Sequence, residues 1–559
     1  METLTTFILP LLIAIITTLL YETKRTKPCP KAPSIPDPIP FISNTYLSLT
    51  NLPAFQAKVS FFQRTSSNVL TYRLGPKNVY IVQGADNVSP LMRVTNDTGS
   101  CDGSRKAMQL ANALTFQKDV ENPHHDWLDL SNCTIYMLKT CFPSQVRHSS
   151  EAFIVGILAP LGFDSSDIKK FARDTSSRLK KGSAWSDTPS HERVWYGLHK
   201  VYEEWMTRKK FSYSMAGKYL DDFESRLENK FPVGEYVEGN VFQFLKDEMG
   251  AASLVAMCGP RLLNMNGGRK FVDLAWEYDA IAFYILTGAP RWWDRKPFEV
   301  SDKFLEAVGR WVEDGWKKFD WDTEADWEEK FGSRFSREMI KWFLHDAKMS
   351  MKSARGWMGF VIFALISNTV PITTWALYEI IRDPVLLGEV REEVLTVFEG
   401  RTLNTANLLG LPLRIRQGFI LGDTIFPKGY LVQAMVTAAH RDEKTWSAEG
   451  HPAGKFWAQR HVKSVIKGAP GEGERLIPEF DVAGKRGSFM SFGGGSGMCP
   501  GRFIAKQEIL MALATMIARF DVEFVEWTTL DGGKASDRAA RDDPRYDGTI
   551  VVPPDREVK

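Results

Sequence analysis

Cysteine is scarce in this 559-residue sequence, and its six cysteines are not grouped. They form no C-x-x-C pair and no zinc-type spacing, so neither a disulfide framework nor a zinc finger is expected, and scattered free thiols fit a reducing compartment. Neither sign of charge is in excess, because 70 basic and 68 acidic residues give a net charge of +2, and no long basic stripe occurs. The sequence therefore predicts no nucleic acid partner. The cysteines are Cys29, Cys101, Cys133, Cys141, Cys258 and Cys499.

The body of the chain has no internal repeat and no low-complexity linker after its first forty residues. We therefore predict one folded unit over residues 41–559, and a hydrophobic content of 44% is sufficient for a large core. Residues 190–397 are mainly helical in pattern, and a last long helix is expected to begin at Arg502. Alternating β-formers in 71–84 and 419–435 predict two strand pairs. The predicted fold is mainly α with small β-sheets.

Charge is absent from Thr3 to Tyr21 near the N-terminus, and this stretch is strongly apolar. As a helix it would be ~28 Å long, close to the hydrocarbon thickness of a bilayer. One acidic residue precedes it and three basic residues follow it, which favours a lumenal N-terminus and a cytosolic body. A cleavable signal peptide would need basic residues in front of this stretch and small residues at a cleavage site, and neither is present. We predict a single-pass membrane anchor over residues 1–27 and a stiff proline-rich hinge over 28–40.

A glycine-rich segment near the C-terminal end carries the most specific pattern of the sequence. In SFGGGSGMCPGRFIAKQEI, residues 491–509, Phe492, Gly495, Cys499 and Gly501 follow the spacing F-x-x-G-x-x-x-C-x-G. A thiolate that ligates a metal must be held rigidly, kept dry and given backbone N–H donors. Glycines let the loop pass under a flat macrocycle, the phenylalanine can shield the sulfur, and the N-terminus of the following helix favours the thiolate. A phosphate-binding loop would end in Lys-Ser/Thr, which is missing here.

This segment resembles the cysteine loop of cytochromes P450, which are haem-thiolate proteins. The resemblance implies the P450 fold with an N-terminal transmembrane helix, haem b as cofactor, Cys499 as the iron ligand, and Phe492 and the two motif glycines around the cofactor. Ser496 and Gly497 stand where the family often has an aromatic and a basic residue. The basic residue usually pairs with a haem propionate, so that contact must be replaced. The alternative is a merely structural cysteine in a glycine-rich turn.

Residues 360–384, FVIFALISNTVPITTWALYEIIRDP, resemble the long helix that crosses the haem in this family. The family usually has an acid–threonine pair there, which delivers protons to bound dioxygen. This chain has Asn368 and Thr369, followed by Pro371. Thr369 is predicted to hydrogen-bond the oxygen, whereas the Asn368 amide cannot donate a proton as an acid would, and we take both as candidate catalytic residues. The Asn-Thr pair followed by proline resembles the branch of sterol 7-alpha-hydroxylases, prostacyclin synthase and fungal relatives. The alternative to a catalytic role is a kinked core helix whose polar residues are incidental.

Residues 193–200, RVWYGLHK, resemble the helix whose W-x-x-x-R pair holds a haem propionate. Trp195 matches through its indole N–H, and His199 stands at the position of the arginine. The resemblance therefore implies that both residues bind the cofactor. Packing alone is the alternative, since residues at i and i+4 meet on the face of any helix.

One family element is missing from the sequence. The Glu-x-x-Arg helix is expected within residues 402–418, TLNTANLLGLPLRIRQG, which contain no glutamate. Glu379 and Arg382 have the spacing but lie one helix too early. In the family this pair binds a structural arginine, which Arg460 matches. An inactive remnant, lacking one helix near Leu413–Arg414, is therefore an alternative.

The resemblance and the anchor together imply a monooxygenase of the endoplasmic reticulum membrane whose catalytic domain is cytosolic. The implied reaction inserts one oxygen atom from O2 into a lipophilic, sterol- or terpenoid-like substrate. The implied partners are an NADPH-dependent reductase that supplies electrons, the small-molecule substrate and the lipid bilayer. An isomerase or dehydratase of the prostacyclin-synthase type, which needs no reductase, is an alternative that Asn368 favours slightly.

Overall fold

The computed structural model describes about two thirds of the chain, arranged in two compact units. The sheet unit contains residues 1–153, 416–455 and 483–498, and the helical unit contains 154–415, 456–482 and 499–559. The predicted anchor and residues 28–32 and 40 of the predicted hinge lie outside the described residues. These are 33–39, 42–82, 134–178, 188–286, 291–403, 431–434, 440–467, 475–480, 489–493, 498–543 and 551–559, with short gaps inside several ranges.

The sheet unit is built on a five-stranded sheet in the order β1-β2-β9-β3-β4. The hairpin predicted at 71–84 is confirmed, because β1 and β2 pair antiparallel from Val69↔Val82 to Leu74↔Lys77. Of the strand pair predicted within 419–435, the structure describes one strand, β9. It pairs parallel with β2 and antiparallel with β3. Residues 419–430, which were expected to form its partner strand, lie outside the described residues. Helix α2 precedes β1 in the chain. The bounds are α2 Ser43–Thr50, β1 Val69–Leu74, β2 Lys77–Val82, β3 Thr134–Phe142, β4 Gln145–His148, β9 Leu431–Ala434 and a short α19 Glu443–Trp446.

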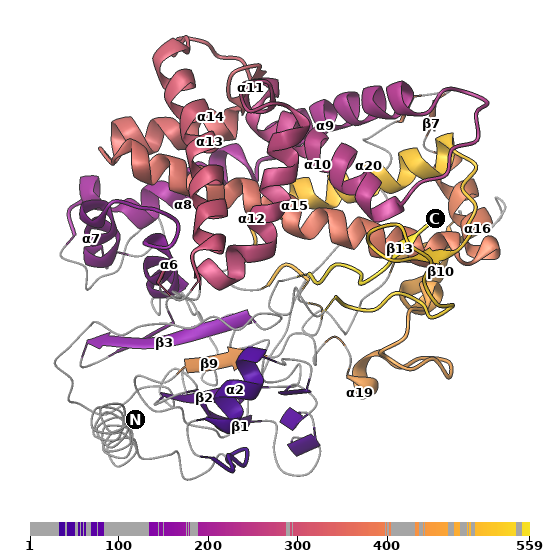
Figure 1. The fold of residues 1–559 in the computed structure, drawn as a ribbon, viewed down its shortest axis with the longest axis horizontal. Helices are drawn as coiled ribbons and strands as arrows, with labels where there is room; N and C mark the ends of the chain where they lie inside the picture. The colour runs from indigo at the N-terminus through magenta and orange to yellow at the C-terminus, as the bar shows by residue number, and fades with distance from the viewer. Residues whose placement is uncertain are drawn as a thin grey trace, which may run out of the picture. The chain divides into compact units, whose positions relative to one another are not determined.

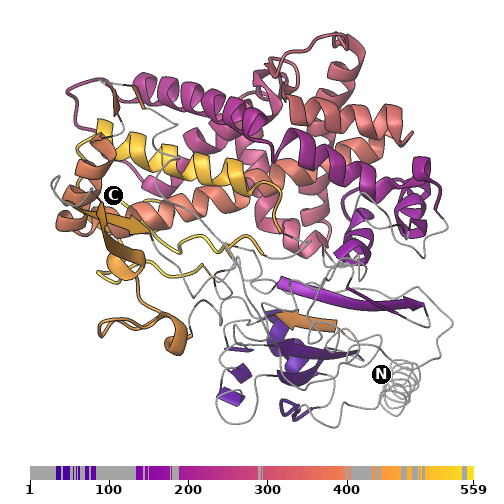
Figure 2. The ribbon, with the colours of Figure 1, turned by 180° about the vertical axis from the view of Figure 1, so that it is seen from behind.

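Helices make up most of the helical unit (Figures 1 and 2), and its described residues also form four two-stranded ribbons. The prediction of a mainly α fold with small sheets is therefore confirmed. The helices are α6 Ser150–Leu158, α7 Ser165–Arg173, α8 Val194–Trp205, α9 Lys209–Lys230, α10 Val241–Cys258, α11 Pro260–Met265, α12 Arg269–Leu286, α13 Lys296–Lys318, α14 Arg334–Lys341, α15 Met351–Ile381, α16 Pro384–Leu395 and α20 Arg502–Arg519. The ribbons are β5–β6 (Trp327–Glu328, Gly332–Ser333), β7–β8 (Phe398–Glu399, Thr402–Leu403), β10–β11 (Val462–Lys467, Arg475–Phe480) and β12–β13 (Trp527–Thr528, Glu557–Val558).

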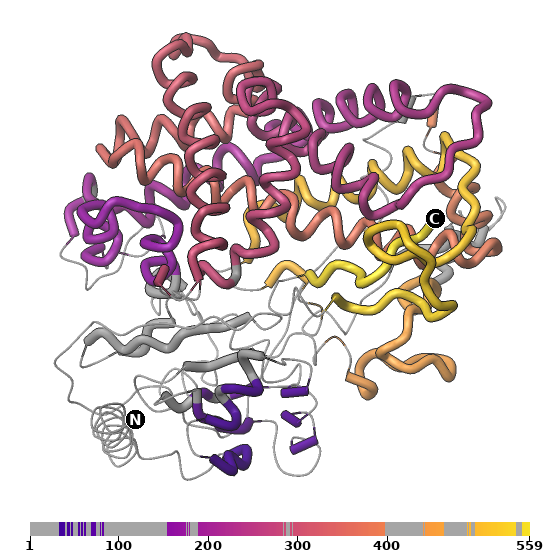
Figure 3. Tube along the Cα trace, in the orientation of Figure 1, coloured from indigo at the N-terminus to yellow at the C-terminus, as the bar shows by residue number. Residues whose placement is uncertain are grey.

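Helix α15 is the central helix of this unit, and it packs against α10, α12, α13, α16 and α20 (Figure 3). Its sequence is apolar on nearly every side, as expected of a helix that others surround. The carboxylate of Asp167 in α7 holds its N-terminus, accepting hydrogen bonds from the backbone N–H of Ser350 and from the Ser350 and Ser353 hydroxyls, each at 2.8 Å. Among the described residues, α15 is the one helix long and apolar enough to cross a membrane, but most of its apolar window is buried, as in a core helix.

Helix α10 receives its N-terminal cap from the far end of the chain. The carboxylate of Glu557 in β13 accepts hydrogen bonds from the backbone N–H groups of Phe242 and Gln243, both at 2.8 Å. Glu557 is almost fully buried and lies within 3.3 Å of the Tyr378 hydroxyl of α15. This contact ties β13 to both α10 and α15, because a carboxylate at a helix N-terminus satisfies orphan N–H groups and interacts favourably with the helix dipole.

Candidate functional site

Cys499 lies immediately before α20 and is partly exposed. Burial raises the pKa of the Cys499 thiol, while backbone N–H groups of Gly501 and Arg502 and the charge of Arg502 oppose that rise. The Arg502 guanidinium also donates to the Cys499 carbonyl at 2.8 Å, which fixes the turn into the helix. These N–H groups and the helix N-terminus would stabilise a thiolate that ligates a metal, as the motif predicts.

A methionine from α8 lies beside this turn. A Cβ atom placed on Gly501 would lie 3.8 Å from the Cys499 sulfur and 3.9 Å from the Met206 sulfur, which are ordinary contact distances. The packing of the described protein therefore does not itself require glycine at 501. The predicted reason for this glycine, close approach to a flat cofactor, stays a prediction.

The remaining residues of the cysteine motif lie in the sheet unit. Phe492 is partly exposed, and Gly493 beside it has a φ of +71°, which glycine adopts without strain. Gly495 lies outside the described residues. The shielding role of Phe492 and the cofactor contact of Gly495 remain predictions.

The neighbouring residues Asn368 and Thr369 lie on different sides of α15. Thr369 is 4% exposed, and its hydroxyl donates to the Leu365 carbonyl at 2.8 Å. Asn368 is partly exposed, between Ala364, which is exposed, and Ile372, which is 36% exposed. Residues spaced by four form one face of a helix, so Asn368 is the polar group on an open apolar face. Its amide N–H also donates to a carbonyl of the same helix, that of Ala364, but at the longer distance of 3.5 Å.

The indole of Trp195 in α8 is buried and already hydrogen-bonded. Its N–H donates to the Phe171 carbonyl at 3.0 Å, and its backbone N–H donates to the Asp174 carboxylate at 3.0 Å. The ring also packs edge-on against Phe171, with centroids 5.0 Å apart. Contact with a propionate, as the family pattern implies, would require the indole to leave Phe171. In this structure Trp195 joins α8 to α7.

His199 lies one turn further along α8 and is partly buried. Burial and the charge of Arg178 lower the pKa of His199, while Glu203 opposes the shift. Its imidazole is therefore mainly neutral near pH 7 and would meet a propionate as a hydrogen-bond donor, without the positive charge of an arginine.

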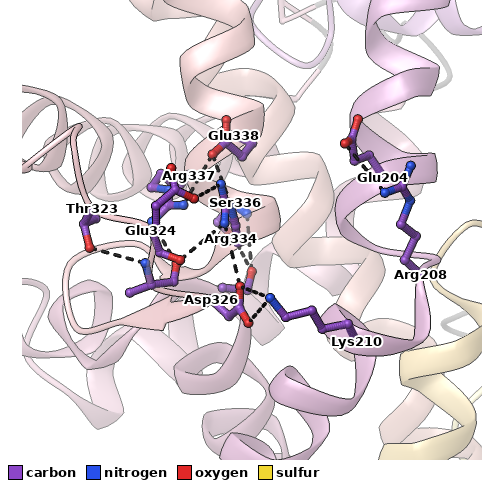
Figure 4. Close-up of polar contacts among 12 residues, drawn as sticks. Glu204, Arg208, Lys210, Thr323, Glu324, Asp326, Arg334, Ser336, Arg337 and Glu338 are labelled. Carbon is purple, nitrogen blue, oxygen red and sulfur yellow. Dashed lines mark hydrogen bonds and ion pairs between the residues drawn. The ribbon is translucent and has the colours of Figure 1, made fainter.

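Charged residues brace the corner between α8 and α9, next to Met206 (Figure 4). The guanidinium of Arg334 lies 4.3 Å from the centroid of the Trp205 ring and pairs with Glu324 at 2.8 Å. Lys210, at the start of α9, pairs with Asp326 at 2.9 Å. Arg334 is largely shielded from solvent, so its stacking on Trp205 is expected to stabilise the corner by about 1–2 kcal/mol.

Helices α8 and α15 are also joined by a hydrogen bond between side chains. The indole N–H of Trp357 donates to the Tyr202 hydroxyl at 3.1 Å, and Tyr202 lies one turn before Met206. Sequence reasoning did not identify Tyr202, Met206 or Asp167. No local motif marks them, because their roles depend on contacts between distant helices.

The predicted Glu-x-x-Arg interval, apart from Thr402–Leu403, and the Leu413–Arg414 junction lie outside the described residues. Glu379 pairs with Arg382 at 3.7 Å, across one turn of α15 and its end. Arg460 is partly buried, and its guanidinium lies 5.8 Å from the centroid of the Trp457 ring.

Comparison with known proteins identifies the family. The family model for cytochrome P450 matches residues 403–531, which include the cysteine motif. A cytochrome P450 monooxygenase of Penicillium decumbens, calL, is 33% identical over 93% of this chain and 90% of its own length. The chain belongs to the cytochrome P450 superfamily. It is an oxidoreductase of the monooxygenase type, and membership implies a haem iron.

More distant relatives match about half of this P450. They include the monooxygenase efuG of Hormonema carpetanum, 25% identical over 52% of the chain and 58% of the relative, and fsoE of Humicola fuscoatra, 28% identical over 50% and 56%. The described residues fit a haem. They offer one partly exposed sulfur at a helix N-terminus and space for a neighbouring group beside Gly501. They also offer an open apolar face on α15 whose single amide is that of Asn368.

Proposed function

We propose that this P450 inserts one oxygen atom from O2 into a lipophilic substrate, of sterol- or terpenoid-like size, at the cytosolic side of the endoplasmic reticulum. Electrons would come from NADPH through a reductase. The observation that carries the proposal is the cysteine turn before α20, in a chain related over nearly its whole length to a fungal monooxygenase. The apolar face formed by Ala364 and Ile372 supports an apolar substrate.

The bound haem would supply the activation of dioxygen, and the chain would hold and orient the reactants. Cys499 would hold the iron, with Phe492, Gly495 and Gly501 shaping the loop. His199 would contact the cofactor edge from α8, and Trp195 would do so once its indole has left the Phe171 carbonyl. The open apolar face of α15 would exclude water from the substrate side. The amide of Asn368 would hold a hydrogen bond on that side, because its side chain is the polar group there.

The test of the proximal ligand is Cys499→Ala in the full-length protein. We expect the thiolate-type ferrous–CO absorption to disappear and NADPH-dependent product formation to be lost, because no other cysteine of the sequence stands in the F-x-x-G-x-x-x-C-x-G motif. Cys258→Ala is the matched control, since Cys258 is fully buried at the end of α10 and its thiol is kept neutral by burial. A normal ferrous–CO spectrum from Cys499→Ala would overturn the assignment. Product formed at full rate without NADPH would instead indicate an isomerase.

The test of the distal side compares Asn368→Ala with Thr369→Ala. Loss of the Asn368 amide is expected to lower product per NADPH and release peroxide, because the open face then has no polar group to hold a proton donor. Thr369→Ala is expected to have the smaller effect, since Thr369 is buried and its hydroxyl donates to Leu365 at 2.8 Å, whereas Asn368 is partly exposed and its contact with Ala364 is longer, at 3.5 Å. Stronger uncoupling in Thr369→Ala than in Asn368→Ala would show that the hydroxyl leaves the helix during turnover.

A further inference from the structure

A glutamate is buried on the inner face of α20, the helix that begins just after Cys499. Glu508 is 1% exposed, and neither of its carboxyl oxygens has a hydrogen-bond partner among the described residues. Its neighbours on the buried face of α20 include Met511 and Ala512. A carboxyl group in such surroundings must be compensated, because burying an unpaired polar group is unfavourable.

Two further hydroxyls face the same interior space from other helices. Tyr219 of α9 and Ser253 of α10 are completely buried, and each hydroxyl oxygen also has no hydrogen-bond partner among the described residues. Helix α9 packs against both α10 and α20, so the three side chains come from helices that meet.

Electrostatics supports this proximity. The hydroxyl of Ser253 partly offsets the rise that burial causes in the pKa of Glu508, and a charge on Glu508 would raise the pKa of Tyr219 further. Yet the three groups make no direct hydrogen bond of normal geometry to one another. They are close enough to influence one another, but Ser253 does not meet Glu508 with the geometry of a normal hydrogen bond.

We propose that Tyr219, Ser253 and Glu508 enclose an internal binding site for ordered water, which bridges α9, α10 and α20. Water is the ligand that fits, because it can donate to and accept from all three groups, and buried water usually makes about three hydrogen bonds to otherwise unsatisfied polar atoms. The site would hold α20, and with it the turn that carries Cys499, against α9 and α10. It is independent of the substrate and of the electron donor.

The experiment counts slowly exchanging internal water in the haem-loaded, full-length protein by water-oxygen magnetic relaxation dispersion. The ferrous–CO form is used because it is diamagnetic. Glu508→Leu fills the site with an apolar side chain and should lose part of the internal-water signal, whereas Glu508→Gln keeps both hydrogen-bonding atoms and should retain it. Tyr278→Phe is the control, since Tyr278 is a buried tyrosine of α12 stacked on Phe304, away from this junction.

A second measurement covers the case in which Glu508→Leu does not fold. A crystal structure of the unmodified holoenzyme should show water within hydrogen-bonding distance of at least two of the three groups. A direct Glu508–Ser253 hydrogen bond with no water between them would overturn the proposal. So would an unchanged relaxation signal in a folded Glu508→Leu variant.

Discussion

Replacing Glu508 by glutamine should make the stability of this P450 less dependent on pH. Burial raises the pKa of Glu508 from 4.5 to about 8, while the unfolded chain ionises near the ordinary value. Between these two values the folded protein binds a proton that the unfolded chain has released. The stabilising contribution of the protonated acid is therefore complete below the unfolded pKa and declines as pH rises towards the folded one.

The size of the effect follows from the shift. Each pH unit within the window changes the free energy of unfolding by about 1.4 kcal/mol, so about 2.7 kcal/mol is lost between pH 5 and pH 7. Glutamine cannot ionise, and Glu508→Gln avoids this loss. The pKa values of Asp279 and Glu557 are also raised by burial, each to about 7, but both groups are present in wild type and variant and drop out of the difference.

The assay is the urea concentration at which half of the haem absorbance is lost after a fixed time, for wild type and Glu508→Gln, at several pH values from about 5 to about 8. Such a fixed-time measurement is needed because large haem proteins rarely unfold reversibly in two states. Glu523→Gln, at an exposed position, is the matched control. Two curves that stay parallel from low to high pH would refute the view that Glu508 is a neutral buried acid.

Two further predictions concern the ends of the chain. Glu557→Ala should lower the free energy of unfolding by roughly 2–4 kcal/mol, because it leaves the N–H groups of Phe242 and Gln243 without their acceptor. The urea midpoint of Glu557→Gln should lie between those of wild type and Glu557→Ala, and a midpoint of Glu557→Ala equal to that of wild type would contradict the prediction. Deleting residues 1–27 should move the protein from the membrane pellet towards the soluble fraction while haem content stays unchanged, and loss of haem from the shortened protein would show that the segment does more than anchor.

Features that depend on neighbouring residues could be predicted from the sequence. The spacing around Cys499 predicted the family, which the match of the cytochrome P450 family model over residues 403–531 confirms. The predicted start of a helix at Arg502 agrees with α20, because proline and glycine precede it. The β1–β2 hairpin could likewise be predicted, from the alternating β-forming residues on both sides of a Gly-Pro turn.

Features that join distant segments could not be predicted in this way. The parallel pairing of β9 with β2 brings together residues some 350 positions apart. At Asn368 and Thr369 the residue types were recognised, but only burial separates the open amide from the hydroxyl bonded to Leu365. The hydrogen bond from the Trp195 indole to the Phe171 carbonyl likewise joins two helices that no local pattern relates, while the predicted contact of Trp195 with a propionate stays a prediction.

The cap that Glu557 provides for α10 has a consequence for how the protein is made. Phe242 and Glu557 are 315 residues apart along the chain. At a synthesis rate of roughly 5–20 residues per second, α10 leaves the ribosome some 15–60 s before its capping carboxylate exists. During that time α20 is also missing, so the apolar faces of α9, α10 and α15 are exposed. We expect chaperone supply during this interval, more than final stability, to limit the yield of this P450 in a foreign host.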